Sequence, residues 1–283
     1  MQQITQQPTV IRRTRTGKIN IRSGNRVSLV LSSTLWTLGA LTVLAFFFFD
    51  YTGFRPLQAI PETLYNLKAM FLEPKLSHFG WGEAAMQVAI TLGLGALATV
   101  FGAVFAFFLA LGAAENLSVP WLSRSIRVVV AFVRAVPTVL WVLIFAIAAG
   151  LGSEAAVLGM LFHSVAYLVK AFSEAFEEVD PKILEALRAT GAGWWQTVVH
   201  GVLPSTFTYL LSWTFLRFEI NFSVAVAMGA AAGAGGIGFE LFMASGFYFD
   251  LREVGMITYM ILAVAIVLEV FSTRLKSRVY SAG

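Results

Sequence analysis

Long apolar runs separated by short polar segments dominate the chain. Six of these runs are long enough to cross the ~30 Å hydrocarbon core of a bilayer as helices, at 1.5 Å per residue. The pattern therefore predicts an all-α integral membrane protein with about six transmembrane helices. The runs cover residues 28–49, 84–112, 125–149, 154–176, 205–230 and 253–273.

Two shorter segments complete the predicted organisation. In residues 56–72, apolar side chains recur at helical intervals, which predicts an amphipathic helix on the outer membrane interface. The first 27 residues are polar and basic, without an acidic residue. The predicted parts are thus a basic cytoplasmic tail (1–27), a first span with the interfacial helix (28–83), and a core (84–283).

Composition excludes several classes of protein. The 283 residues are 58% hydrophobic and 13% charged, whereas soluble domains average about 25% charged residues. The chain has no cysteine, and its three histidines are far apart in the sequence, so we expect no metal site. The motifs G-x-S-x-G and H-E-x-x-H do not occur. We therefore expect no catalytic residues and no enzyme activity.

Charge predicts the orientation of the chain. With an even number of spans both termini lie on one side, and that side carries most of the Lys and Arg outside the spans. Because cytoplasmic loops are enriched in Lys and Arg, both termini are predicted to be cytoplasmic. The net charge of +4 follows from this bias, so we expect membrane lipid as a neighbour and no nucleic acid.

One loop on the predicted cytoplasmic side, residues 177–204, differs from the others. Asp180 followed by Pro181 predicts the start of a helix that runs to about Thr190. Its apolar face either docks into a groove of a partner or packs on the bundle itself. That face consists of Ile183, Leu184 and Leu187. A glycine turn and a second short segment follow: Gly191, Gly193 and residues 194–202, ending at Pro204.

This loop resembles the EAA loop of ABC-importer membrane subunits. The matching positions are Glu185, Ala186, Gly191, Leu203 and Pro204. Two positions depart from the pattern: Leu187 replaces the third alanine, and Gly201 replaces an apolar residue. Further stretches, from about residue 84 onward, resemble the phosphonate-import permease family: "FHSVAYLVKAFSEAFEEVDP", "EALRATGA", "GVLP", "RFEIN" and "GAGGIG".

The resemblance implies a type I ABC-importer permease fold in a bacterial cell membrane. Two permease subunits, identical or sister chains, would form the pore, and an external binding protein would deliver phosphonate, phosphite or phosphate. A cytoplasmic ATPase dimer would hold ATP and Mg²⁺, since this chain has no G-x-x-x-x-G-K-[ST] motif. The residues expected to couple to the ATPase are Glu185, Ala186, Leu187 and Gly191.

Charges inside the predicted spans mark a candidate substrate pathway. Arg134 and Arg217 fall near mid-membrane, where a charge costs a few kcal/mol unless it faces a pore or a partner. Asn221 lies one helical turn beyond Arg217, so we expect the two side chains to share a face. Alternatively, Glu219 pairs with Arg134 or Lys170 and only holds the bundle together. We also expect an ion pair between Lys170 and Glu174, and a hydrogen-bonded packing role for His163. The pathway candidates are Arg134, Arg217, Glu219, Asn221 and Ser223, the last standing where the family has an arginine, which leaves the exact substrate open.

The stretch "GAGGIG" fits the dinucleotide-binding pattern G-x-G-x-x-G but follows a helical run instead of a strand. A tight turn at the outer pore mouth is the better interpretation. We expect this outer gate loop to contain Gly233, Gly235, Gly236 and Gly238. An importer of a different small solute, a secondary transporter and a membrane enzyme are the alternative functions. The absence of a clear duplication argues against the secondary transporter.

Overall fold

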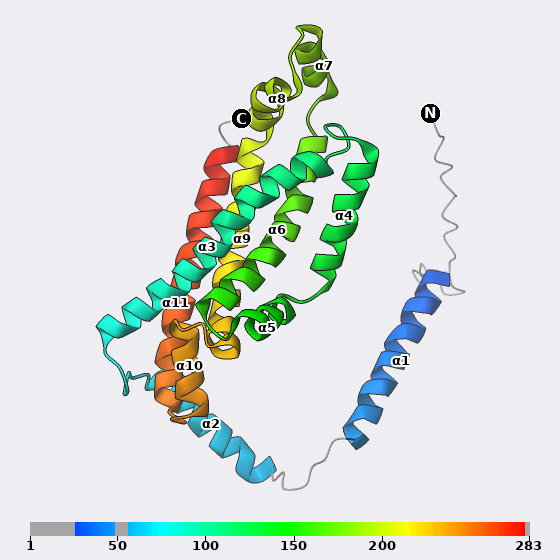
Figure 1. The fold of residues 1–283 in the computed structure, drawn as a ribbon. Coiled ribbons are helices and arrows are strands. Elements are labelled where there is room, and N and C mark those ends of the chain that lie inside the picture. Colours follow the sequence, from blue (N-terminus) through cyan, green and yellow to red (C-terminus); the bar gives the residue numbers. More distant parts are fainter. Residues whose placement is uncertain (1–25, 49–55, 281–283) are drawn as a thin grey trace, which may run out of the picture. The chain divides into compact units, whose positions relative to one another are not determined.

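The computed structural model describes residues 26–48 and 56–280, and every regular element in them is a helix (Figure 1). The predicted N-terminal tail lies outside these residues, apart from its last two. The chain divides into two compact units, 1–60 and 61–283. The helices are α1 (Arg26–Phe48), α2 (Pro56–Leu72), α3 (Trp81–Ala113), α4 (Pro120–Ala135), α5 (Thr138–Ala149), α6 (Ser153–Glu177), α7 (Pro181–Ala189), α8 (Trp194–Thr197), the π-helical turn η1 (Val198–Val202), α9 (Leu203–Ala232), α10 (Ile237–Gly246) and α11 (Leu251–Tyr280).

The predicted number of spans is confirmed. Five helices of the described residues are long and apolar enough to cross a membrane, and a bent pair of helices raises the number to six. In α1, the hydroxyls of Ser33, Thr34 and Thr42 each donate to a carbonyl within the helix, at 2.8–2.9 Å. These bonds remove the cost of placing the hydroxyls in hydrocarbon.

The third predicted span is not one straight helix, so the prediction of a single element over 125–149 is wrong. It consists of α4 and α5, which meet at an angle of 90°. Pro137 has no N–H to continue the ladder and disfavours helical backbone in the residue before it. Val136 accordingly adopts extended backbone angles (φ −89°, ψ 125°). The break places Arg134 in the last turn of α4.

The prediction that a separate short segment ends at Pro204 is also wrong. Residues Trp194–Ala232 form one continuous 39-residue helical run through α8, η1 and α9. Proline in a regular α-helix would clash with the carbonyl four residues earlier and leave it without a donor. The π-helical turn precedes the proline directly, and the N–H of Leu203 bonds to the carbonyl of Val198, five residues back. This wider turn accommodates the proline without ending the helix.

Small residues allow the helices of the 61–283 unit to pack closely around α6. A Cβ atom at Gly159 of α6 would lie 2.5 Å from Val142 of α5. On α3, a Cβ at Gly95 would lie 3.1 Å from the backbone of Phe222, and one at Gly102 would lie 3.0 Å from Ser164. Close approach through small residues is typical of helix pairs in membranes. It brings α3, α6 and α9 together at the level where the polar residues of the bundle lie.

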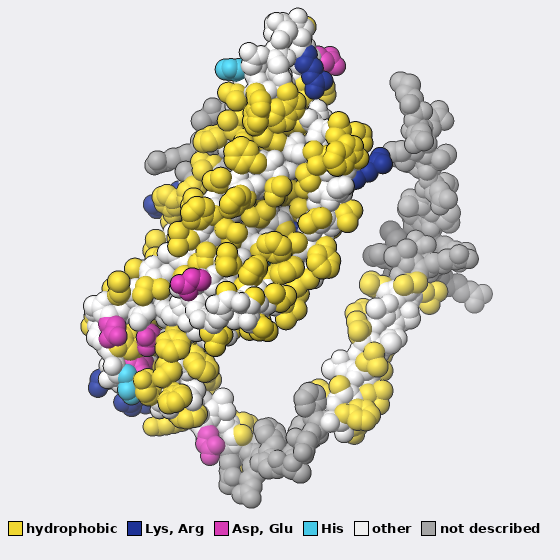
Figure 2. All heavy atoms as spheres, viewed as in Figure 1, with side chains coloured by type: hydrophobic (Ala, Val, Ile, Leu, Met, Phe, Trp, Pro, Cys, Tyr) yellow, Lys and Arg dark blue, Asp and Glu magenta, His cyan; other side chains and the backbone are white. Residues whose placement is uncertain are grey.

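The apolar helix α10, which the sequence analysis missed, folds back against α9 (Figure 1). A Cβ atom at Gly238 would overlap the carbonyl oxygen of Val226, and one at Gly229 would lie 2.7 Å from the amide nitrogen of Phe239. Figure 1 shows α7 and α8 at one end of the 61–283 unit and α10 near the other. On the face shown in Figure 2, hydrophobic side chains cover the middle of this unit, and most charged ones lie near its ends.

The predicted helix over 56–72 is confirmed as α2. The hydroxyl of Tyr259 in α11 donates to the carbonyl of Phe71, at 2.7 Å. The predicted apolar face of α2 is exposed, with Leu57 and Leu64 at 88% and 62%. Its place on the membrane interface stays a prediction.

Replacing Gly238 by alanine should destabilise the protein, because the added methyl group overlaps the backbone of α9. We expect a loss of about 1–3 kcal/mol, the usual cost of overpacking, measured as a lower thermal unfolding midpoint in detergent. Gly93→Ala is the matched control, since a Cβ there meets nothing within 4 Å and alanine favours a helix by up to ~1 kcal/mol. Equal midpoints for both variants would contradict the close approach of α9 and α10.

Candidate functional site

A buried polar cluster joins three helices in the middle of the bundle. Asn221 of α9 donates through Nδ2 to Thr99 Oγ1 of α3 at 2.8 Å and to Ser164 Oγ of α6 at 2.9 Å. Arg217, one turn earlier on α9, donates through Nε to the same Ser164 oxygen, at 2.9 Å. The predicted shared face of Arg217 and Asn221 is therefore confirmed. All four side chains are buried, and Asn221 is fully so.

The guanidinium of Arg217 is only partly satisfied by this cluster. Its Nη2 atom is buried and has no hydrogen-bond partner. The ring of Tyr167 on α6 lies below it, with the guanidinium carbon 5.3 Å from the ring centre. Arg134 of α4 approaches the same ring, at 5.7 Å. Within residues 26–48 and 56–280, neither arginine has a carboxylate within ion-pair distance. Two cations thus share one aromatic ring without a counter-ion.

The other pathway candidates lie apart from this cluster. Ser223 is exposed and its hydroxyl is directed to the carbonyl of Glu219, at 3.4 Å. Glu219 forms no ion pair with Arg134 or Lys170 in the described part of the chain, so the alternative of a structural pair is wrong there. The expected Lys170–Glu174 pair is confirmed, at 2.9 Å. Thr99, Ser164 and Tyr167 were not predicted, because isolated hydroxyls in a span carry no periodic signal.

His163 was expected to be a hydrogen-bonded packing residue. Its Nδ1 atom is buried and has no hydrogen-bond partner. The ring nevertheless forms a hydrogen bond with the backbone of Val133, so the expected hydrogen-bonded role is confirmed, although Nδ1 takes no part in it. His163 lies one residue before Ser164 on α6, so a polar atom without a partner stands next to the buried cluster.

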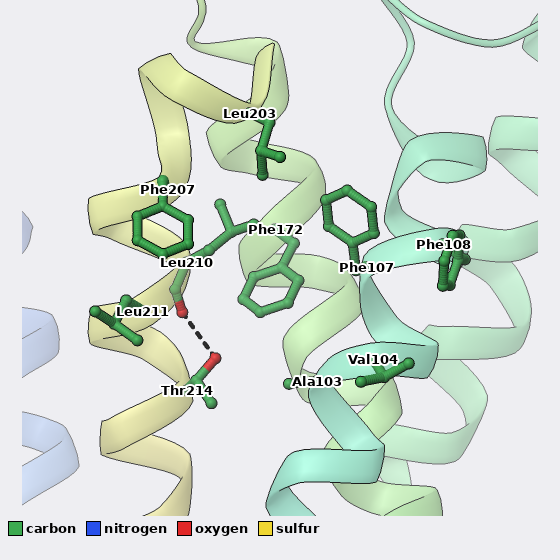
Figure 3. A pocket seen from close by; sticks show the side chains of 10 residues that line it. All are labelled: Ala103, Val104, Phe107, Phe108, Phe172, Leu203, Phe207, Leu210, Leu211 and Thr214. Atoms are coloured by element: carbon green, nitrogen blue, oxygen red, sulfur yellow. Dashed lines mark hydrogen bonds between the residues drawn. The ribbon is translucent and has the colours of Figure 1, made fainter. Parts of the chain in front are cut away.

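A groove of about 400 Å³ between α3 and α9 differs from this site in being apolar (Figure 3). Phe107 and Phe172 line it from α3 and α6, and Leu210 lines it from α9. Its one hydroxyl, on Thr214, donates within the helix to the Leu210 carbonyl at 2.8 Å. The groove offers no group that would bind a charged solute, and its surface suits lipid chains or an apolar helix.

Helix α7 begins as predicted. The side chain of Asp180 accepts a hydrogen bond from the Lys182 N–H, at 2.9 Å, and Pro181 occupies the first helical position. Gly191 follows the helix with φ +84°, a conformation that favours glycine. Gly193 has ordinary extended angles and begins α8. The predicted turn is confirmed, with Gly191 as the position that requires a glycine.

Part of the apolar face of α7 packs on its own chain, whereas Ile183 stays 40% exposed. Leu184 is buried, and a Cβ atom at Gly201 of η1 would lie 2.7 Å from Leu187 Cδ1. The two departures from the EAA pattern therefore compensate each other, because the large Leu187 fills the space that a side chain at 201 would occupy. The opposite face of α7, with Glu185 and Ala186, is exposed.

Hydrogen bonds anchor this end of the bundle. Trp194 Nε1 donates to the Leu117 carbonyl, at 2.8 Å, and Asn116 Nδ2 donates to the Phe176 carbonyl, at 2.7 Å. Arg127 of α4 forms an ion pair with Glu177 at the end of α6. The segment between α3 and α4 is thereby fastened to α6 and α8. These contacts hold the end of the bundle that includes α7 in place on α4 and α6.

The glycine loop between α9 and α10 makes the expected tight turn. Gly233, Gly235 and Gly236 have φ of +61°, +74° and +76°. The amide of Gly236 donates to Gln87 Oε1 at 3.1 Å, and the next amide donates to Thr91 Oγ1 at 2.9 Å. Both acceptors belong to α3, so the loop is fixed on the bundle. Gly238, which was also expected in this loop, lies in α10 instead, so the prediction is wrong for that residue.

A second polar cluster lies near the start of α11. The carboxylate of Glu253 accepts from the amides of Ser77 and His78, both at 2.9 Å, and its other oxygen is 2.5 Å from His78 Nδ1. Asp250 completes a group whose possible ligand atoms lie within 4.8 Å of one another. Burial opposes the ionisation of Asp250, but hydrogen bonds from Ser77 and from two backbone amides lower the pKa of this carboxyl. These bonds fasten the segment before α3 to α11.

Comparison with known proteins identifies the family. Residues 102–280 match the family described as "Binding-protein-dependent transport system inner membrane component". The chain belongs to this family. Members of this family are inner-membrane components of transport systems, and the several apolar helices of this chain agree with such a multi-pass component.

Curated relatives and solved structures agree with this family. The phosphite transport system permease protein PtxC of Stutzerimonas stutzeri is 38% identical over 188 residues, which cover 66% of this chain and 65% of the relative. The phosphate-import permease protein PhnE of Mycolicibacterium smegmatis is 33% identical over 192 residues, covering 67% and 36%. The matched region thus spans less than two thirds of each relative.

Solved structures show the same fold. A chain of the MetNI methionine ABC transporter in inward-facing conformations superimposes with a TM-score of 0.64 at 19% identity, covering 72% of this chain and 99% of that one. A chain of a bacterial alginate importer gives 0.61 at 13% identity, covering 90% and 99%. At these identities the likeness establishes the type I ABC-importer permease fold alone.

The compensation between Leu187 and Gly201 is testable with a double-mutant cycle. Gly201→Val should lower the thermal unfolding midpoint because its side chain collides with Leu187, and Leu187→Ala should lower it by leaving a gap. The double variant should recover about 0.5–3 kcal/mol relative to the sum of the two changes. A cycle of Ala186→Val with Gly201→Val should be additive, since Ala186 faces outward. Additive effects in the Leu187 cycle would contradict the packing of α7 on η1.

Proposed function

We propose that this chain is the permease subunit of an ABC importer that carries a small phosphorus oxyanion, namely phosphite, phosphate or a phosphonate. The observation that carries the proposal is the pair of guanidinium groups, Arg217 and Arg134, on the Tyr167 ring without a carboxylate counter-ion in the described residues. The named substrates of the relatives, phosphite and phosphate, support the same chemistry.

In this proposal Arg217 contacts the anion. A guanidinium presents parallel N–H donors that match the oxygens of a phosphorus oxyanion, and such charge-assisted bonds are strong. One of its nitrogens, Nη2, is free, while Nε is held by Ser164. A passing anion would supply both the missing acceptor and the missing charge. An uncharged solute would supply only the acceptor.

Asn221 has a positioning role in this proposal. Its amide already donates to Thr99 and Ser164, and its oxygen lies 3.2 Å from Ser164 Oγ. It has little hydrogen-bonding capacity left for a solute. By holding the Ser164 side chain in place, Asn221 positions the oxygen that accepts the hydrogen bond from Arg217 Nε. Glu219 and Ser223 lie on other faces of α9. They stay candidates for lining the pathway where a second subunit faces this one.

The partners follow from the family and the placement of the elements. The family name implies a binding protein, which we place at the α10 end, where the glycine loop would belong to the outer gate. We place α7 and both termini on the cytoplasmic side, with the exposed face of α7 bound to an ATPase dimer that holds ATP and Mg²⁺. A second permease subunit, identical or related, completes the pore, and lipid surrounds the apolar faces.

Removal of the Arg217 guanidinium should abolish transport. We expect Arg217→Ala to lower uptake about 30-fold or more, because loss of a buried charge-assisted contact costs about 2–5 kcal/mol. The measurement is uptake of radiolabelled phosphate and phosphite by cells that express the complete system. Lys68→Ala is the control, since this exposed cation of α2 pairs with Glu73 and belongs to neither polar cluster. Co-purification of the ATPase with the Arg217 variant shows that the complex still assembles, and normal uptake by that variant would refute the proposal.

The proposed contact between α7 and the ATPase makes a second prediction. A cysteine at Ala186 should cross-link to the ATPase subunit, because this position is exposed on the outer face of the helix. A cysteine at Leu184, which is buried against the bundle, should not cross-link under the same conditions. The chain has no cysteine of its own, so each variant carries a single reactive thiol. Cross-linking of the two positions to the same extent, or of neither, would contradict the proposed coupling face.

A further inference from the structure

A small pocket lies between α4 and α6, beside the arginine pair. It has a volume of about 170 Å³ and is lined by Arg127, Arg134, Lys170, Ser173 and Glu174 together with apolar side chains. A water molecule occupies about 30 Å³ in the liquid, so the pocket holds roughly five water volumes. That space has room for an inorganic phosphorus oxyanion.

The pocket has an excess of positive charge. Lys170 pairs with Glu174 at 2.9 Å, and Arg127 pairs with Glu177, which lies just beyond the pocket. Arg134 has no carboxylate partner among the described residues and leaves the group with one uncompensated cation. The hydroxyl of Ser173 is buried and donates to the Lys170 carbonyl at 3.0 Å. Its oxygen retains acceptor capacity, but its proton is already used.

Arg134 connects this pocket to the buried cluster. Arg134 lines the pocket, and its guanidinium carbon lies 5.7 Å from the centre of the Tyr167 ring. The guanidinium of Arg217 lies over the same ring. On α6, polar side chains follow one face at alternating spacings of four and three residues. They span about 21 Å at 1.5 Å per residue and lead toward the end that carries α7. These residues are His163, Tyr167, Lys170, Glu174 and Glu177.

Two of these charged side chains are exposed on a helix that could span a membrane. The Lys170 and Glu174 side chains are 50% and 48% exposed in the single chain, within a helix long and apolar enough to span a membrane. Charged side chains within a span face a water-filled path or a protein partner, since contact with hydrocarbon is costly. A water-filled path along the face formed by α4 and α6 would meet this requirement.

We propose that the pocket between α4 and α6 is a second anion-binding site, which receives the phosphorus oxyanion from Arg217 on its way to the α7 end. Arg134 contacts the anion at both positions. Lys170 exchanges its bond to Glu174 for a bond to the anion, so the anion meets a cation at each step. The inference rests on the proposed function, since it names the next site on the same pathway.

Single cysteines test this site directly, because the chain has none of its own. The probe is Ser173→Cys, a nearly isosteric change inside the pocket, in membranes that contain the complete transport system. We expect it to react faster with the anionic reagent MTSES than with the cationic reagent MTSET, against the preference of a free thiolate for cations. Inorganic phosphate should slow the labelling about tenfold at saturation. Val129→Cys, on an exposed face of α4, should show neither effect.

Charge removal completes the test. In the Ser173→Cys background, Lys170→Gln should reduce the advantage of MTSES about tenfold and weaken the protection by phosphate, whereas Lys68→Gln should change neither. Faster reaction with MTSET, or no protection by phosphate, would overturn the second site. If Arg217→Ala abolishes uptake and these labelling results fail, the proposed function stands and only this inference is lost. If labelling behaves as expected but the cells take up no phosphorus oxyanion, the site binds anions and the proposed substrate is wrong.

Discussion

The burial of a guanidinium among membrane helices is the constraint on which the rest of the structure depends. Arg217 is 2% exposed, and a charge in this position costs a few kcal/mol even on the lenient scale. Ser164 and the Tyr167 ring offset part of that cost, and Asn221 and Thr99 hold Ser164 in place. These contacts need α3, α6 and α9 to come close, which the glycines at their crossings permit. Packing through small residues thus serves the placement of one charge.

The same helix connects this charge to the surface expected to meet the ATPase. Arg217 and η1 belong to one helical run, Trp194–Ala232, and about 22 Å of helix separates Arg217 from the end of η1 at 1.5 Å per residue. Helix α7 rests on η1 through Leu187 and Gly201. A displacement of α7 therefore acts on η1 and α9 without an intervening flexible loop. The π-helical turn lets Pro204 lie within this rod without breaking it.

The amount that could be predicted from the sequence differed from element to element. Hydropathy located every span because twenty apolar residues have few alternatives to a membrane helix. Ten residues are too few to cross a membrane, so α10 gave no such signal. The break before Pro137 became visible only in the extended backbone angles of Val136. Arg217 and Asn221 were predicted from their depth and their spacing of four. Ser164 and Tyr167 were not, because their role depends on which face of α6 meets α9, and that is decided by packing.

The distribution of polarity on the 61–283 unit determines which surfaces meet lipid and which meet water. The groove between α3 and α9 is lined by phenylalanine and leucine, and its one hydroxyl is satisfied within its own helix (Figure 3). The pocket between α4 and α6 is lined by three cations, Arg127, Arg134 and Lys170, and hydrocarbon would solvate them poorly. A single chain cannot keep hydrocarbon away from that surface. A second permease subunit facing it would do so and would enclose a water-filled path between the two copies. In such a pair the cations would lie on the inner wall of the path. The need to shield them from hydrocarbon would then favour assembly of the two subunits, and the same cations would make the path selective for anions.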